Sequence, residues 1–211
     1  RPPGPHDAVD RECMTRALAA AATVRCATSP NPWVGAVVRT PDGRMFHGAT
    51  EAPGGAHAEI VALQQAGDQA RGATLYVTLE PCAHTGRTGP CTQAIIDAGI
   101  SRVVVGIEDP DPQVTGRGLD QLRAAGIDVT LGVQADHVAG QLTAYLTHRR
   151  TGRPYVVLKL AATLDGGTAA PNGTSQWITC PEARADGHRL RAESDAILVG
   201  EALVKHGDPR T

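Results

Sequence analysis

The sequence is poor in aromatic residues, with three Tyr, two Trp and one Phe among 211 residues. It also has no excess of basic charge, since 20 Lys and Arg stand against 22 Asp and Glu, for a formal net charge of −2. Proteins that bind nucleic acid normally carry a basic face, and those that extract a base also offer rings for stacking. The composition therefore argues against a nucleic-acid partner.

Long apolar segments are missing as well. The longest apolar run lies around residues 17–24, and it is too short and too rich in Ala to span a bilayer. No charged-then-apolar signal peptide opens the chain, which begins with Pro-rich residues 1–5 and no Met, so we expect the natural start to lie upstream. Five cysteines, an odd number, predict free or metal-bound thiols in a reducing compartment. We therefore expect a cytoplasmic protein with no membrane partner.

The pattern of apolar and turn-forming residues predicts an α/β protein. Helices are expected over residues 7–24, 56–66, 91–98, 119–125, 134–148 and about 181–192. Strands are expected over residues 34–39, 45–49, 75–79, 103–107, 128–132, 155–161 and 196–199. Strand and helix alternate from residue 75 onward, which is typical of parallel strands in an α/β layer fold. The two early strands form a hairpin, which makes the sheet mixed.

A domain boundary is expected at the polar, Gly- and Pro-containing stretch 149–154, because such stretches commonly link domains. It separates a first domain at 1–150 from a second at 153–211. In the second domain, Thr179-Cys180-Pro181-Glu182 predicts a capping box that opens the last helix.

Two separate motifs carry metal-binding and acid–base chemistry. His57 and Glu59 open a predicted helix, and Cys82 follows a predicted strand, with Cys91 nine positions further on. One imidazole and two thiolates suit Zn²⁺, and three protein ligands leave the fourth tetrahedral position open, as in catalytic zinc sites. Zinc lowers the pKa of water from about 15.7 to about 7, and Glu59 can move the protons that a hydrolytic deamination requires. Histidine–any–glutamate followed by Pro-Cys is typical of zinc nucleobase deaminases, although the spacing between the cysteines is longer here.

The residues between the two cysteines are predicted to form a loop that binds an anion. Arg87 can pair with a phosphate, and backbone N–H groups of this Gly-rich loop can add to the site. His84 is the one nearby candidate for a fourth metal ligand, and we expect it to line the substrate pocket instead.

Several longer stretches resemble the bifunctional riboflavin-biosynthesis deaminase/reductase family, and they extend over nearly the whole chain. The long spacing between the cysteines is also what that family has. The matching stretches are SPNPWVGAVV at 29–38, AHAE at 56–59, YVTLEPCAHTGRTGPC at 76–91, DPDPQVTGRG at 109–118, TGRPYV at 151–156, KLAATLDG at 159–166 and SQWIT at 175–179.

The resemblance implies a three-layer cytidine-deaminase-like domain with a mixed sheet, followed by the start of a dihydrofolate-reductase-like α/β domain. The first domain would deaminate 2,5-diamino-6-ribosylamino-4(3H)-pyrimidinone 5′-phosphate with Zn²⁺, and the second would reduce the ribose with NADPH. The implied roles are zinc ligation by His57, Cys82 and Cys91, proton transfer by Glu59, deaminase substrate binding by Asn31 and Arg87, NADPH contact by Ala161 and Trp177, and reductase substrate binding by Ser175 and Arg191. A homo-oligomer is compatible with the resemblance, since the family tends to oligomerise.

The sequence departs from the family pattern at four positions. Thr50 replaces a common His near the deaminase substrate, and Asp111 replaces a common Asn. Leu203 and Gly207 replace a Thr and an Asp that normally contact NADPH. The second domain has only 59 residues, too few for a complete nucleotide-binding core, so we expect deaminase activity without independent reductase activity.

Two other functions fit a zinc site of this kind. A tRNA or polynucleotide deaminase shares the zinc chemistry but predicts a basic face and stacking aromatics. A non-catalytic zinc or redox module predicts a fourth protein ligand and no requirement for Glu59.

Overall fold

The computed structural model describes residues 5–83, 89–112 and 114–201. The chain divides into two compact units, Arg1–Tyr155 and Val156–Thr211. No helix among the described residues is long and apolar enough to cross a membrane.

The first unit is built on a five-stranded mixed sheet with the strand order β2-β1-β3-β4-β5. Its strands are β1 (Gly35–Arg39), β2 (Met45–Ala49), β3 (Thr74–Leu79), β4 (Arg102–Ile107) and β5 (Asp128–Leu131). Strand β1 pairs antiparallel with both β2 and β3, whereas β3, β4 and β5 run parallel. The predicted hairpin and the predicted parallel strands are thus confirmed.

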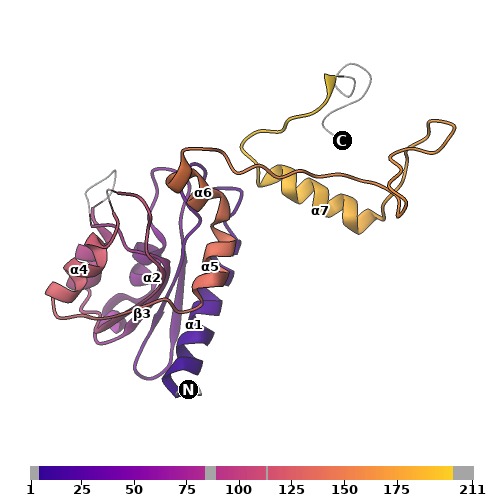
Figure 1. Cartoon of the computed structure of the whole chain (residues 1–211). Helices are drawn as coiled ribbons and strands as arrows, with labels where there is room; N and C mark the ends of the chain where they lie inside the picture. The colour runs from indigo at the N-terminus through magenta and orange to yellow at the C-terminus, as the bar shows by residue number, and fades with distance from the viewer. Residues whose placement is uncertain (1–4, 84–88, 113, 202–211) are drawn as a thin grey trace. The chain divides into compact units, whose positions relative to one another are not determined.

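Helices cover both faces of this sheet. They are α1 (Pro5–Ala22), α2 (Ala58–Ala66), the short 3₁₀ helix η1 (Gly67–Ala70), α3 (Cys91–Asp97), α4 (Arg117–Ala124), α5 (Ala135–Gln141) and α6 (Thr143–Thr151). Helices α1 and α5 lie together on one face, and α2 and α4 lie on the other (Figure 1). The arrangement has three layers, as predicted.

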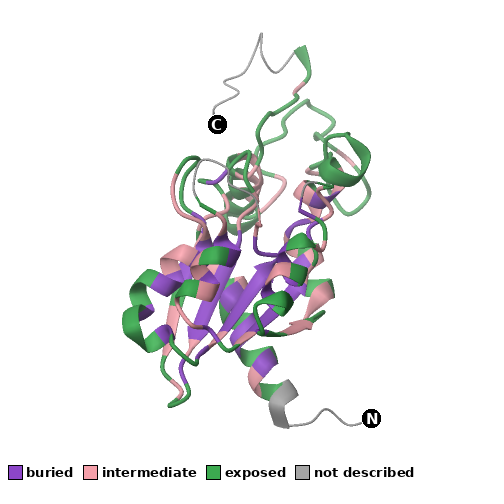
Figure 2. Ribbon diagram, turned by 90° about the vertical axis from the view of Figure 1, so that its left-hand side faces the viewer, coloured by how far each residue is buried: buried purple, intermediate pink, exposed green. Residues whose placement is uncertain are grey.

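The core forms where the strands are buried from both sides. Val103–Val105 of β4, Val77 of the adjacent strand β3 and Val37 of β1 have no exposed surface. These strands are the most buried part of the molecule (Figure 2). Strands covered on both faces are expected to be continuously apolar, which explains why β4 lacks the polar–apolar alternation of a half-exposed strand.

Two glycines allow helices to approach the sheet closely. A Cβ atom on Gly35 would lie 1.9 Å from the carbonyl oxygen of Ala17 in α1. A Cβ atom on Gly48, on the opposite face, would lie 2.1 Å from the carbonyl oxygen of Ala58 in α2. Since no side chain fits at either position, the glycines set the distance of both helices from the sheet.

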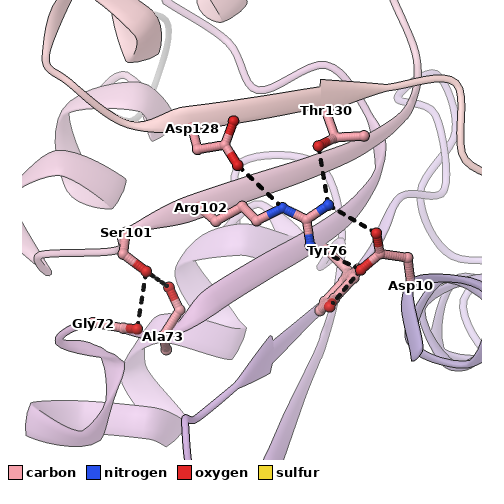
Figure 3. A network of polar contacts seen from close by, with 8 residues as sticks. All are labelled: Asp10, Gly72, Ala73, Tyr76, Ser101, Arg102, Asp128 and Thr130. Atoms are coloured by element: carbon pink, nitrogen blue, oxygen red, sulfur yellow. Dashed lines mark hydrogen bonds and ion pairs between the residues drawn. The ribbon is translucent and has the colours of Figure 1, made fainter. Parts of the chain in front are cut away.

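A partly buried ion-pair network lies where the parallel strands begin (Figure 3). Arg102 in β4 donates two hydrogen bonds of 2.9 and 2.8 Å to the carboxylate of Asp10 in α1. Tyr76 in β3 donates a third hydrogen bond to Asp10, and Arg102 also contacts Thr130 and the exposed Asp128 in β5. The network joins one helix to three strands.

The helix predicted over 134–148 is wrong as a single element, because it divides at Leu142 into α5 and α6. The hydroxyl of Thr143 donates hydrogen bonds to the carbonyl oxygens of Ala139 and Gly140 at 3.0 and 2.8 Å. A threonine hydroxyl that bonds carbonyls of the preceding turn competes with the backbone and bends a helix.

The second unit has one helix among its described residues, α7 (Pro181–Ala192). The strands predicted over 155–161 and 196–199 are wrong, because the described residues there form no sheet. Their apolar side chains are exposed, with Val156 79% and Leu198 99% accessible. A strand requires a hydrogen-bonded neighbour, and the described part of this unit supplies none.

The predicted capping box is also wrong. Cys180 is the N-cap of α7 and makes no side-chain capping hydrogen bond. Pro181 does occupy the first turn of α7, where its missing N–H group costs no helical hydrogen bond.

Candidate metal centre

Three segments that are distant in sequence meet at the edge of the sheet where β3 and β4 end. His57 immediately precedes α2, Cys82 follows β3 by three residues, and Cys91 is the first residue of α3. Because α2 and α3 pack against each other, their N-terminal ends converge on the segment that carries Cys82.

The donor atoms of these three residues could hold one metal ion. The ligand atoms of His57, Cys82 and Cys91 all lie within 4.8 Å of one another. The Nδ1 atom of His57 is 3.2 Å from Sγ of Cys91 and 3.6 Å from Sγ of Cys82. Tetrahedral zinc with ordinary bond lengths separates a nitrogen and a sulfur ligand by roughly 3.5 Å. The donor set and its spacing therefore fit Zn²⁺.

The two thiols share a proton unevenly. The hydrogen bond between them lowers the pKa of Cys82 and raises the pKa of Cys91, and burial raises the pKa of Cys91 further. The pKa of His57 is raised, first by its hydrogen bond with Cys82. The lowered pKa of Cys82 favours its thiolate, which is the form of cysteine that binds a metal ion.

Glu59 lies in the first turn of α2, two residues after His57, and is 3% exposed. Burial, followed by the charge of Cys82, raises the pKa of its carboxyl group to about 7. A carboxyl group with a pKa near neutrality can both accept and donate a proton under working conditions. This is the property that a proton shuttle requires.

The position of α2 is set by the close approach of Gly48. The atom nearest to a Cβ atom placed on Gly48 is the carbonyl oxygen of Ala58. Ala58 stands between His57 and Glu59 in the sequence. His57 has extended backbone angles (φ −75°, ψ 159°), and its carbonyl oxygen accepts a hydrogen bond from the N–H of Val61. The imidazole and the carboxyl group are therefore fixed to the same end of one helix.

The predicted substrate residues lie in different parts of the chain. Asn31 is exposed in the loop before β1, and β1 begins at the sheet edge where β3 ends. Asn31 thus belongs to the same edge as the metal centre. His84 and Arg87 lie outside the described residues.

Two of the positions that depart from the family pattern have structural partners. Thr50 is buried, and its hydroxyl accepts a 3.1 Å hydrogen bond from the N–H of Val34, which joins the end of β2 to the start of β1. Asp111 forms a 3.2 Å ion pair with Arg149 in α6. Leu203 and Gly207 lie outside the described residues.

The residues predicted to serve the reductase lie in the second unit. Ser175 and Trp177 are exposed ahead of α7, Ala161 is half-buried, and Arg191 is half-buried in the last turn of α7. Trp177 stacks under the guanidinium of Arg184, 4.3 Å from the ring centre. The roles of these four residues stay predictions.

Sequence reasoning missed Glu80, which stands between β3 and Cys82. Its carboxylate is buried and accepts hydrogen bonds from four backbone N–H groups. The signal was present in the Glu-Pro-Cys motif, because a carboxylate directly after a buried strand must find partners.

The first unit is similar to a known class of zinc-binding enzymes. Residues 7–107 match the family model of the cytidine and deoxycytidylate deaminase zinc-binding region. This range includes the sheet from β1 to β4 and all three candidate ligands, so the fold and the site are those of zinc-binding deaminases. Residues 154–211 match the RibD C-terminal domain.

Over most of its length the chain is similar to proteins named RibD. It is 50% identical over 201 residues to riboflavin biosynthesis protein RibD of Escherichia coli K12. The aligned region covers 95% of this chain and 54% of that protein. The solved structure of Acinetobacter baumannii RibD is 44% identical with a TM-score of 0.86, over 93% of this chain and 56% of that one. A Thermotoga maritima diaminohydroxyphosphoribosylaminopyrimidine deaminase/5-amino-6-(5-phosphoribosylamino)uracil reductase is 40% identical with a TM-score of 0.89, over 95% and 58%.

These matches confirm the predicted resemblance and the cytidine-deaminase-like fold of the first unit. The second unit lies within the residues that match the RibD C-terminal domain. The chain spans about half the length of the curated relatives that it matches.

Proposed function

We propose that this chain catalyses the zinc-dependent hydrolytic deamination of the riboflavin-pathway intermediate 2,5-diamino-6-ribosylamino-4(3H)-pyrimidinone 5′-phosphate. The observation that carries the proposal is the convergence of one imidazole and two thiols beside the buried carboxyl group of Glu59. The reaction replaces the 2-amino group by oxygen, so that one water molecule is consumed and one ammonia molecule is released.

His57, Cys82 and Cys91 would hold the zinc ion. When bound, zinc supplies the Lewis acidity that makes hydroxide available at neutral pH. Glu59 takes one proton from the attacking water and passes it to a ring nitrogen. It then takes the second proton from the added hydroxyl group and gives it to the departing amine, which leaves as ammonia. Burial of Glu59 and Cys91 keeps bulk water away from these transfers.

The choice of substrate rests on the family. The names of the relatives assign deamination of this pyrimidine and reduction of its product to complete proteins. In this chain, Asn31 lies at the sheet edge of the metal centre, and we assign it to base recognition. Arg87 and His84 are assigned to the substrate phosphate and the pocket wall.

A second part of the proposal concerns the reductase. The described residues of the second unit are mostly exposed and form no sheet, so nothing in them closes around a nicotinamide cofactor. We therefore assign NADPH, with its contacts to Ala161 and Trp177, and the reductase substrate contacts of Ser175 and Arg191, to the complete proteins of the family. A reduction assay with NADPH and the deaminated product should show no turnover by the 211-residue chain.

The deaminase proposal is tested by removing the shuttle while keeping the metal. Glu59→Gln should retain about one zinc per chain but lose roughly 10²- to 10⁴-fold in ammonia release, because only the proton transfers are removed. Glu12→Gln is the matched control, since Glu12 is exposed in α1 and pairs with Arg16. It should leave both readouts unchanged.

The Glu59→Gln comparison and a binding assay with tRNA distinguish this proposal from the other two functions. A non-catalytic zinc module predicts that parent and Glu59→Gln both bind zinc and neither releases ammonia. A polynucleotide deaminase predicts that tRNA, and not the ribosyl phosphate, is bound in a gel-shift assay and deaminated. We propose a small-molecule substrate, no nucleic-acid partner and a cytoplasmic location, and sedimentation would decide whether the chain forms a homo-oligomer.

A further inference from the structure

The segment that carries Cys82 lies beyond the regular part of the sheet. Strand β3 ends at Leu79, and the N–H of Glu80 makes one more sheet-like hydrogen bond, to the carbonyl oxygen of Ile107 at 3.0 Å. Pro81 has no N–H to donate. Cys82 therefore depends on other contacts for its position.

The carboxylate of Glu80, two residues before Cys82, anchors this segment, and Glu80 is 4% exposed. Its Oε2 atom accepts hydrogen bonds from the N–H groups of Asp109 at 3.2 Å and Gly116 at 3.1 Å. Its Oε1 atom accepts hydrogen bonds from Gly118 at 3.0 Å and Leu119 at 3.4 Å.

Three of the four donors belong to the N-terminal end of α4. The first N–H groups of a helix have no partner within the helix, and the N-cap residue usually supplies one. Here the N-cap is Gly116, which has no side chain and a left-handed backbone (φ 73°). Glu80 thus caps α4 from a separate segment, and its negative charge suits the positive end of the helix dipole.

Helix α4 also touches the Cys82 segment directly. A Cβ atom on Gly118 would lie 2.0 Å from the carbonyl oxygen of Pro81, so the first turn of α4 packs on the residue before Cys82. Residue 118 must therefore be a glycine for α4 to contact Pro81, and the Glu80 cap holds α4 in this contact.

The second cysteine is linked to the same helix. Thr92, next to Cys91, donates a 2.8 Å hydrogen bond from its hydroxyl to Gln121 in α4. The N–H of Thr92 donates a 3.2 Å hydrogen bond to the carbonyl oxygen of Cys82. Both thiol-bearing segments are thus attached to α4, one of them through Glu80.

We propose that Glu80 is a positioning residue of the metal centre, which fixes the separation of Cys82 from Cys91 by capping α4 in place of its glycine N-cap. Glu80 touches neither the metal nor the substrate. It acts through the Cys82 segment. The inference rests on the zinc binding of the proposed function, but not on the reaction or the substrate.

The test compares two buried carboxylates in the full 211-residue chain. Each carboxylate oxygen of Glu80 accepts hydrogen bonds from two N–H groups. In Glu80→Gln an NH₂ group, which donates, replaces one of these oxygens, so the cap is broken while the size of the side chain stays nearly the same. Asp10→Asn makes the same change at the opposite end of the sheet, where the carboxylate is equally buried. Zinc affinity is measured by competition with a chromophoric chelator, at a temperature at which circular dichroism shows both variants folded.

Loss of a group that orients metal ligands typically weakens binding by about 10- to 100-fold. We expect Glu80→Gln to weaken zinc binding by about ten-fold and to shift the ligand-field absorption spectrum of the cobalt(II)-substituted protein. Asp10→Asn should change neither readout, although it also lowers stability. A spectrum shifted in the first variant alone is not expected from a general loss of stability.

The inference is overturned if folded Glu80→Gln binds zinc as tightly as the parent, or if Asp10→Asn weakens binding equally. Should Glu80→Gln fail to fold, Glu80→Asp decides by the same comparison, because it keeps the charge but withdraws the carboxylate by one methylene. The result is separable from the deaminase proposal. If the parent binds zinc but releases no ammonia, only the reaction fails, and if the parent is active but Glu80→Gln keeps normal affinity and spectrum, only the positioning role fails.

Discussion

Buried charge occurs at both ends of the five-stranded sheet, but it is balanced in different ways. Where the parallel strands begin, Asp10 receives two hydrogen bonds from Arg102 and one from Tyr76. The hydrogen bond with Asp10 is the main reason that the pKa of Arg102 is raised, so the guanidinium of Arg102 stays charged in the folded chain.

Where the strands end, three buried carboxyl groups have pKa values above their ordinary ones. Burial is the largest influence on Glu59, Glu80 and Asp109, and the pKa of each is raised. Acids with raised pKa values beside a cluster of thiols are typical of functional sites. The difference indicates that one end of the sheet holds an ion pair that stabilises the fold, whereas the other holds buried acids with raised pKa values near the candidate metal ligands.

The largest expected effect is at the metal end, upon loss of one thiol. Cys91→Ala should reduce zinc content from about one per chain to near zero and ammonia release by more than about 10⁴-fold, because water without zinc has a pKa of about 15.7. Metal analysis and an ammonia assay measure the two effects. Cys13→Ala is the matched control, since Cys13 is equally buried but lies in α1. The contrast fails if the two variants keep equal amounts of zinc.

A smaller effect, on stability, is expected at the other end. Arg102→Met should lower the free energy of unfolding by about 3–5 kcal/mol, because the buried carboxylate of Asp10 loses its partner. The zinc content of the folded protein should remain that of the parent. Asp128→Asn removes the exposed partner of the same guanidinium and should cost less than about 1 kcal/mol in urea unfolding. Loss of zinc from folded Arg102→Met would show that the two ends are not independent.

The smallest effect concerns the pH dependence of stability. Asp109 ionises at its ordinary pKa of 3.8 when unfolded, but burial raises that pKa in the folded protein. Raising the pH from 3.8 through the folded pKa therefore favours the unfolded state. The stability advantage of the parent over Asp109→Asn should shrink over this window in urea titrations.

Asp42, in the turn between β1 and β2 at the opposite end, supplies a control of opposite sign. Its pKa is lowered, first by a hydrogen bond from Thr40. The stability advantage of the parent over Asp42→Asn should therefore grow as the pH rises through the folded pKa towards 3.8. Equal slopes for the two variants would contradict the difference between the ends.

Much of the first unit could be predicted from the sequence, because its patterns agree with its packing. The continuous apolar run at Val103–Val105 predicted a strand buried on both faces, and its neighbours do cover it. The candidate ligands His57, Cys82 and Cys91 could be singled out because zinc chemistry restricts residue types and leaves a spaced motif. The meeting of these residues at one sheet edge then follows from the direction of the strands.

Other features could not be predicted because they depend on distant partners. The apolar stretch 155–161 looks like a strand locally, but a strand forms only beside another, and the described residues of the second unit contain none. The role of Glu80 depends on N–H groups that lie 29 to 39 residues further along the chain. The pairing of Arg102 with Asp10 spans 92 residues, and no local pattern encodes it.

The contact between Gly48 and α2 has a consequence for how the metal centre can fail. His57 and Glu59 flank the residue that rests on Gly48, so a side chain introduced there would push both groups away together as a rigid pair. The imidazole would then leave the thiols while keeping its relation to the carboxyl group. A larger residue at Gly48 would therefore weaken metal binding while Glu59 keeps its place on α2. Gly48 itself is neither a metal ligand nor a proton-transfer group.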